Sequence, residues 1–221
     1  SVQQTSDGGY IIAGHTNSSW DIYLVKTDAS GSMLWSKTFG GEGLEDAWSV
    51  QQTTDGGYIV AGHTLSFGAG SWDIYLVKTD ASGILTWSKT FGGKGSEEGY
   101  SVQQTSDGGY IIAGSTSSFG AGGNDAYLIK TDSSGNQSWS KTFGGTSSDM
   151  FTSVQQTADG GYITTGYTTI DARGYDAYLV KTDASGIMAW SKTFGGTKTD
   201  VFNSVRQTSD GGYIIAGRTN S

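Results

Sequence analysis

The chain contains neither cysteine nor proline among its 221 residues. Without cysteine no disulfide can hold the fold together, so its stability has to come from the packing of a core. The absence of thiols fits an oxidising, extracellular setting. Without proline, glycine has to provide the turns, and the chain contains 36 glycines for this role.

Positive charge is scarce as well. The 13 Lys and Arg residues are outnumbered by 21 Asp and Glu residues, which gives a formal net charge of −8. The lysines lie singly rather than in clusters, so nucleic-acid binding through a basic surface is not expected. No apolar run approaches the roughly 20 residues that a membrane helix needs, so membrane insertion is not expected either. Because the chain begins inside a repeat, we expect it to be part of a longer precursor.

A repeat dominates the sequence. The segment SVQQT, or SVRQT in the last copy, begins at Ser1, Ser49, Ser101, Ser153 and Ser204. These positions divide the chain into full repeats 1–48, 49–100, 101–152 and 153–203 and a partial repeat 204–221. All-β chains of this length often form one domain, so we expect a single domain over residues 1–221.

Each full repeat contains four short runs rich in β-branched and aromatic residues. In the first repeat these runs are Val2–Thr5, Tyr10–Thr16, Asp21–Thr27 and Met33–Phe39. Asp and Gly separate the first run from the second and the third from the fourth, a pattern typical of β-hairpins. No run has the periodicity of a helix. A repeat of about 50 residues with four antiparallel strands predicts an all-β fold, a β-propeller in which each repeat forms one blade.

The number of blades depends on the partial repeat. Four full repeats and two strands of a fifth predict a five-bladed propeller with an incomplete fifth blade. The alternatives are a four-bladed ring with a leftover hairpin, or a larger propeller whose remaining blades lie outside this sequence. If no further hairpin pairs with the last run, Tyr213–Thr219, this run presents an open strand edge that favours self-association.

The order SVQQT, DGGYIIAG, DIYLVKTD and then Trp resembles a kelch blade, although the single Gly14 stands where kelch repeats usually carry two glycines. The segment Asp28–Trp35 also resembles the tryptophan-docking turn of quinoprotein-type propellers, D-x-x-G-x-x-x-W, and it recurs in every full repeat. As a whole, the chain resembles the DGGY-repeat proteins of archaeal and bacterial cell surfaces, most of them of unassigned function. The resemblance implies a propeller and an extracellular or cell-surface location, but no chemistry.

Aromatic residues of the fourth run are expected to pack between blades. Trp and Phe alternate with polar residues there, so the rings lie on one side of the strand. These structural residues are Trp35, Trp87, Trp139, Trp190, Phe39, Phe91, Phe143 and Phe194.

Two connections vary between repeats and are expected to share one face of the propeller, where a localised function would lie. The connection after the fourth run carries an acidic residue at a constant offset in each repeat: Glu45, Glu97, Asp149 and Asp200. These carboxylates either form a ring at the mouth of the central channel that attracts a cation such as calcium, or each closes its own loop by accepting backbone hydrogen bonds. No other cofactor is expected.

The second variable connection and its neighbourhood bring aromatic residues to the same face. Such rings beside acids suit stacking on a sugar or anchoring a protein, unless they tuck between blades. The candidate binding residues are Trp20, Trp48, Trp72, Tyr100 and Tyr175.

No catalytic set is evident in the sequence. It has no Cys nucleophile, HExxH pair or GxSxG elbow, and His15 and His63 have no histidine counterpart in the other repeats. This favours a non-catalytic recognition, adhesion or scaffold module that binds a protein or glycan through the variable face. The alternatives are a structural subunit that assembles through its open blade edge, and a glycoside hydrolase that uses carboxylates at the channel mouth.

Overall fold

The computed structural model of the chain describes residues 1–169 and 174–220. These residues form eighteen β-strands without a helix, which confirms the predicted all-β class. Accordingly, the described residues contain no helix with the length and apolar character needed to cross a membrane.

Four sheets of four strands correspond to the four full repeats. In chain order, their strands are β1 (Val2–Gln4), β2 (Tyr10–His15), β3 (Ile22–Thr27), β4 (Met33–Phe39), β5 (Glu45–Gln52), β6 (Tyr58–Thr64), β7 (Asp73–Thr79), β8 (Leu85–Phe91), β9 (Glu97–Gln104), β10 (Tyr110–Thr116), β11 (Asp125–Thr131), β12 (Gln137–Phe143), β13 (Met150–Gln156), β14 (Tyr162–Thr168), β15 (Asp176–Thr182) and β16 (Met188–Phe194). The partial repeat contributes a two-stranded sheet of β17 (Asp200–Gln207) and β18 (Tyr213–Thr219). Sequential strands pair antiparallel, so each full sheet is the predicted propeller blade.

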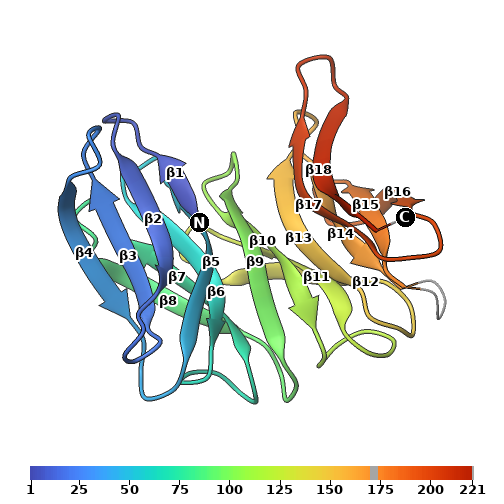
Figure 1. Ribbon diagram of the computed structural model, residues 1–221, viewed down its shortest axis with the longest axis horizontal. Coiled ribbons are helices and arrows are strands. Elements are labelled where there is room, and N and C mark those ends of the chain that lie inside the picture. The colour runs from blue at the N-terminus through green and yellow to red at the C-terminus, as the bar shows by residue number, and fades with distance from the viewer. Residues whose placement is uncertain (170–173, 221) are drawn as a thin grey trace.

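The sheets follow one another along an open arc, from β1–β4 at one end to β17–β18 at the other (Figure 1). The first strands of adjacent sheets contact each other at the centre of the arc. Together they line a cavity of about 350 Å³, to which the Ser, Val and first Gln of the repeated SVQQT motif contribute. The propeller architecture with an incomplete fifth blade is therefore confirmed.

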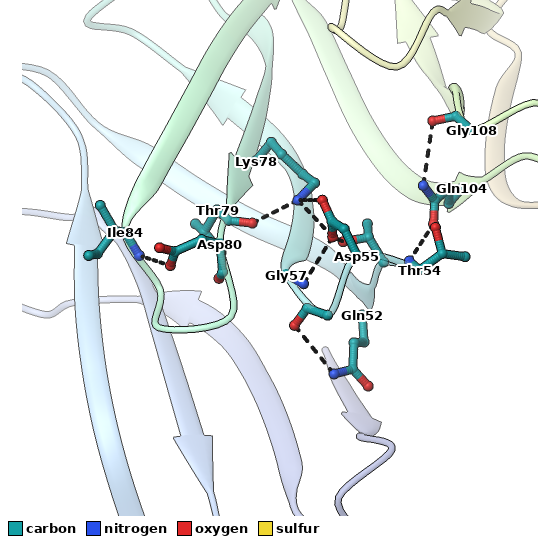
Figure 2. Close-up of polar contacts among 12 residues, drawn as sticks. Gln52, Thr54, Asp55, Gly57, Lys78, Thr79, Asp80, Ile84, Gln104 and Gly108 are labelled. Atoms are coloured by element: carbon teal, nitrogen blue, oxygen red, sulfur yellow. Dashed lines mark hydrogen bonds and ion pairs between the residues drawn. The ribbon is translucent and has the colours of Figure 1, made fainter.

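Asp and Gly fix the turn between the first two strands of each blade. In the second blade, Gly56 has a φ of 82° and Asp55 Oδ1 accepts a hydrogen bond from the backbone N–H of Gly57 at 3.0 Å. Lys78 on β7 places Nζ 2.8 Å from Asp55 Oδ2 and 2.8 Å from the Thr79 carbonyl oxygen (Figure 2). Only 5% of the Lys78 side chain is exposed. The equivalent pairs are Lys26–Asp7, Lys130–Asp107 and Lys181–Asp159.

The two glutamines of SVQQT connect neighbouring blades. Gln51 Oε1 accepts a hydrogen bond from the backbone N–H of Gln104, in the next blade, at 2.6 Å. Gln104 Oε1 accepts one from the backbone N–H of Thr54, in the previous blade, at 2.8 Å (Figure 2). The same reciprocal pair recurs at the other three interfaces between adjacent sheets. Arg206 takes the place of the first glutamine in the last copy.

The hydrophobic core lies between blades rather than inside one sheet. At the first interface, Ile11 and Leu24 of the first blade pack in one cluster with Tyr58 of the second. Trp35 joins this cluster, and its ring lies over Gly83 of the second blade, where an added Cβ would come within 2.7 Å of the indole. The other fourth-strand aromatics join equivalent clusters or contacts: Trp87, Trp139, Trp190, Phe39, Phe91, Phe143 and Phe194.

Two sheet faces at the ends of the arc remain uncovered. Tyr10 and Ile12 of the first blade are 37% and 39% exposed, whereas the equivalent Tyr58 is 2% exposed. At the other end, Ile214 is 64% exposed, whereas the equivalent Ile11 is fully buried. Among the described residues, β18 pairs only with β17, so the fifth blade consists of its two inner strands.

Candidate recognition cleft

The four ring acids predicted at the channel mouth are buried. Glu97 Oε2 accepts a hydrogen bond from Gly93 N at 2.7 Å, and Oε1 accepts one from Thr116 Oγ1 at 2.7 Å and one from Ser118 N at 3.0 Å. Glu97 thereby connects the segment between the second and third blades to a loop of the third blade. This is the contact expected of an acid that closes its own loop. The ring acids Glu45, Glu97, Asp149 and Asp200 are exposed by 1%, 0%, 0% and 5%, and each accepts a backbone hydrogen bond from the glycine four residues earlier.

A second carboxylate lies beside the ring acid. A Cβ added at Gly92 would lie 1.9 Å from Asp73 Oδ1 and 2.5 Å from Glu97 Oε2, so the two carboxylates flank the same point of the backbone. Burial raises the pKa of Asp73, and the negative charge of Glu97 contributes to this. No group of three or more His, Asp or Glu side chains arranged to hold a metal ion occurs in residues 1–169 and 174–220. Calcium binding at the ring acids stays a prediction.

Trp20 stands exposed at the junction of the first two blades. Its ring stacks on that of His15, with centroids 4.3 Å apart and planes inclined by 20°. His15 Nδ1 lies 2.9 Å from Asp46 Oδ1, so a residue of β5 in the second blade holds this pair. Trp20 has a φ of 57°, in the left-handed region that bulky residues rarely adopt, and 46% of the residue is exposed. The fold therefore presents an indole ring in a fixed position.

The second blade carries a related aromatic group. Trp72 makes an edge contact with His63, with ring centroids 4.2 Å apart. Trp48 lies at a bulge in β5, is 47% exposed and contacts Tyr100 of the third blade at 5.6 Å between centroids. The Tyr100 hydroxyl donates a hydrogen bond to Glu98. Aromatic side chains from three successive blades therefore meet on this face.

A cleft of about 240 Å³ lies between the first and second blades. We call it the Trp20–Trp72 cleft. Its lining residues are Trp20, Leu44, Glu45, Asp46, His63 and Trp72.

The cleft combines aromatic walls with negative charge. Asp46 contributes a carboxylate on a side chain that is 19% exposed, whereas the carboxylate of Glu45 is buried and accepts hydrogen bonds from its own loop. No lysine or arginine belongs to the described lining. Burial lowers the pKa of His63 despite the opposing charges of Glu98 and Asp46, so its imidazole is neutral at pH 7. The cleft therefore carries no fixed positive charge of its own.

Three residues predicted from the sequence, Trp20, Trp72 and Glu45, meet in the cleft, and Trp48 and Tyr100 lie beside it. Tyr175, the fourth-blade counterpart of Trp20, lies elsewhere and packs on Tyr167 with centroids 4.3 Å apart.

Sequence reasoning missed Leu44, Asp46 and His63 as lining residues and gave no role to His15. One signal was available for Asp46. An acid directly follows the ring acid in two repeats, as Asp46 after Glu45 and as Glu98 after Glu97. Both acids lie next to a histidine or tyrosine of the aromatic group.

Solved structures share the architecture of this chain. A protein of unknown function from Bacteroides caccae matches with a TM-score of 0.58 and 12% identity, over 94% of this chain and 65% of that one. The WD40 domain of Neurospora crassa Pan2 matches with a TM-score of 0.56 and 13% identity, over 89% of this chain and 55% of that one. This chain thus spans less than two thirds of the length of either protein.

At these identities the structural similarity shows the fold alone, and the fold is a β-propeller. No protein-family model and no curated protein matches the sequence. The kelch-like and DGGY-repeat resemblances therefore stay predictions.

Proposed function

We propose that the chain is a non-catalytic recognition module of a secreted or cell-surface protein, and that it binds a protein or glycan through its variable loop face. The observation that carries this proposal is the Trp20–Trp72 cleft. Trp20 is exposed, yet His15 and Asp46 hold it from two blades. A ring that is already ordered loses little conformational freedom when a partner binds.

The placement of the ring acids does not favour the hydrolase alternative. Glu45 and Glu97 are 1% and 0% exposed. Both carboxylates already accept hydrogen bonds from their loops. A glycosidic bond would need at least one of them to face the substrate.

A comparison of two variants on a glycan array and in pull-down experiments tests the recognition role. We expect Trp20→Ala/Trp72→Ala to weaken capture of the bound partner at least tenfold, the size of effect that central aromatic anchors usually have. Tyr175→Ala is the matched control, because it removes an exposed ring at the same repeat position outside the cleft. Equal capture by the folded wild type and the double variant would contradict the proposal, as would capture of nothing.

The uncovered ends of the arc favour a second candidate, self-association. Each described interface between blades packs the sheet face that carries Ile11, or its equivalent, against the face of the next sheet that carries Tyr58, or its equivalent. One face of each type is uncovered in this chain, around Ile214 and around Tyr10. The outer edge of β18 adds backbone groups that could pair with a strand of another copy.

Sedimentation velocity across a range of concentrations tests this candidate. We expect species larger than a monomer for the wild type and a monomer for Ile12→Glu, which places a charge on the uncovered face of the first blade. Ile187→Glu is a suitable control, because Ile187 is equally apolar and 62% exposed but lies in a hairpin turn away from that face. A monomeric wild type at every concentration would exclude assembly by this chain.

A further inference from the structure

We infer that the Trp20–Trp72 cleft binds a fully methylated, quaternary ammonium group. This inference rests on the proposed recognition function and specifies its ligand. The chemistry is that of a cation without N–H donors, which aromatic faces and nearby carboxylates stabilise together.

The walls of the cleft suit such a group. Trp20 and Trp72 both line it, and indole is the ring that attracts cations most strongly. One face of Trp20 is covered by His15 at 4.3 Å, so the opposite face is the one left to contact a ligand. Leu44 adds an apolar wall that can contact methyl groups.

The charge of the cleft selects a cation over an anion or a neutral group. The carboxylate of Asp46, whose side chain is 19% exposed, lies in the lining, and no lysine or arginine is among the described lining residues. Asp46 Oδ1 accepts a hydrogen bond from His15 Nδ1 at 2.9 Å and one from Ala47 N at 2.8 Å. These contacts hold the Asp46 carboxylate beside the indoles.

The scarcity of hydrogen-bonding groups argues against a sugar as the preferred ligand. Glu45 already accepts hydrogen bonds from Gly41 N, Thr64 Oγ1 and Ser66 N. The remaining polar side chains in the lining are those of Asp46 and His63 and the two indole N–H groups. A pyranose ring would have to satisfy several hydroxyl groups there, whereas a quaternary ammonium group has no donor to satisfy.

The size and rigidity of the cleft also favour a quaternary ammonium group. A volume of about 240 Å³ lies below the usual range for drug-sized ligands, roughly 300–1,000 Å³, and suits a compact head group. Trp20 reaches its position through a backbone φ of 57°. Strained backbone at bulky residues clusters at binding sites, where it fixes the position of a contacting side chain.

Titration with choline chloride, followed by tryptophan fluorescence and NMR chemical shifts, tests the inference. The uncharged isostere 3,3-dimethylbutan-1-ol has the same shape without the positive charge. We expect choline to saturate the signal and the isostere to bind at least tenfold more weakly. Trp20→Ala and Asp46→Asn should each weaken choline binding at least fivefold, while Tyr175→Ala should leave it unchanged. Equal binding of choline and its isostere, or no binding of choline, would overturn the inference.

Three further probes distinguish the sources of the group. These are a trimethyllysine peptide with its unmethylated control, free phosphocholine, and phosphatidylcholine vesicles. If choline does not bind, but Trp20→Ala/Trp72→Ala still abolishes capture of a protein or glycan, the ligand class is wrong and the recognition function stands. If neither choline nor any partner binds, both proposals fail.

Discussion

Lys78 shows at the residue scale how a blade uses a buried charge. Its side chain is 5% exposed, but the carboxylate that it contacts, Asp55, is 63% exposed. The carboxylate keeps part of its hydration, while the ammonium also donates to the Thr79 carbonyl. A buried lysine without such partners would be costly. The pair therefore fastens the inner hairpin to the third strand, and it recurs in every complete blade.

These pairs make stability depend on pH in the acid range. Burial raises the pKa of Asp55, but hydrogen bonds from Lys78 and Thr53 outweigh this and lower it to about 2, from 3.8. Asp107 shows the same balance, with a pKa of about 2. Because the folded pKa is depressed, the stabilisation is present above pH 4 and is lost as the pH falls from about 4 to 2. We expect the free energy of unfolding in urea to fall over this interval.

The variant Asp55→Asn provides the control. It removes one titrating carboxylate, so its free energy of unfolding should be lower at pH 7 and should change less between pH 4 and pH 2. Identical pH dependence in the wild type and in the variant would show that the pair does not contribute.

The first glutamine of SVQQT is open to an equally direct test. Gln51→Arg replaces the acceptor of the Gln104 N–H with a group that only donates. We expect a loss of about 1–3 kcal/mol in the free energy of unfolding, the usual cost of a backbone group left without its partner. Gln51→Glu keeps an acceptor and should cost less in the same urea titration. An equal cost for both variants would contradict this role.

At the scale of the element, the bulge in the first strand of a blade explains why the second strand contains a glycine. The bulge between Ala47 and Ser49 brings the Asp46 carbonyl oxygen to 1.7 Å from the position of a Cβ at Gly62. Equivalent approaches occur at Gly114 and Gly166. The strand therefore needs glycine for close approach, without a turn or a positive φ.

Gly14 occupies the same repeat position in the first blade, and a Cβ there would meet nothing within 4 Å. The two sites form a matched pair. We expect Gly62→Ala to lower the free energy of unfolding by about 2 kcal/mol or more, because backbone atoms have to shift. Gly14→Ala should leave it unchanged or raise it by up to about 1 kcal/mol. Thermal and urea unfolding would reveal this contrast, and equal effects would contradict it.

Most strands of a blade were predictable from the sequence within one residue, because alternation and Asp-Gly turns are local signals. The inner strand was the exception. β5 begins at Glu45, four residues before the SVQQT motif. This start was not predicted, because the two acids at positions 45 and 46 interrupt the apolar alternation of the strand. The orientation of the ring acids, toward the channel or toward their loops, was not predictable from the sequence. It depends on hydrogen bonds to residues about 20 positions later, such as Thr64. The cleft was hidden for a related reason, because His15 and Asp46 meet only when two blades pack together.

At the scale of the whole molecule, the two-stranded sheet β17–β18 is covered by a neighbouring sheet on one face, through Val205, Tyr213 and Ile215. Ile214 on its other face is 64% exposed, and isolated hairpins are marginally stable. We expect amide hydrogens of β17 and β18 to exchange faster than those of β9–β12, which are covered on both sides. Hydrogen exchange followed by mass spectrometry measures this directly. Equal protection in both regions would indicate that another surface covers the end sheet.

Blade number was the part of the architecture that repeats alone did not determine. Repeats specify the contact between neighbours, whereas closure depends on how small rotations between blades accumulate. The structure accordingly contains four complete blades and half of a fifth in an open arc (Figure 1).

Arg206 puts a hydrogen-bond donor on the last sheet where the other copies of the motif have the side-chain acceptor of the first glutamine. At each of the four interfaces, an amide oxygen in the earlier blade receives an N–H from the later one. A guanidinium offers only donors at that point. A further repeat beyond β17 would therefore find no side-chain acceptor at Arg206, whose guanidinium donates to the Val205 carbonyl oxygen at 3.4 Å. An identical sixth repeat would place its N–H against a donor, so this one substitution discriminates against simple extension of the series.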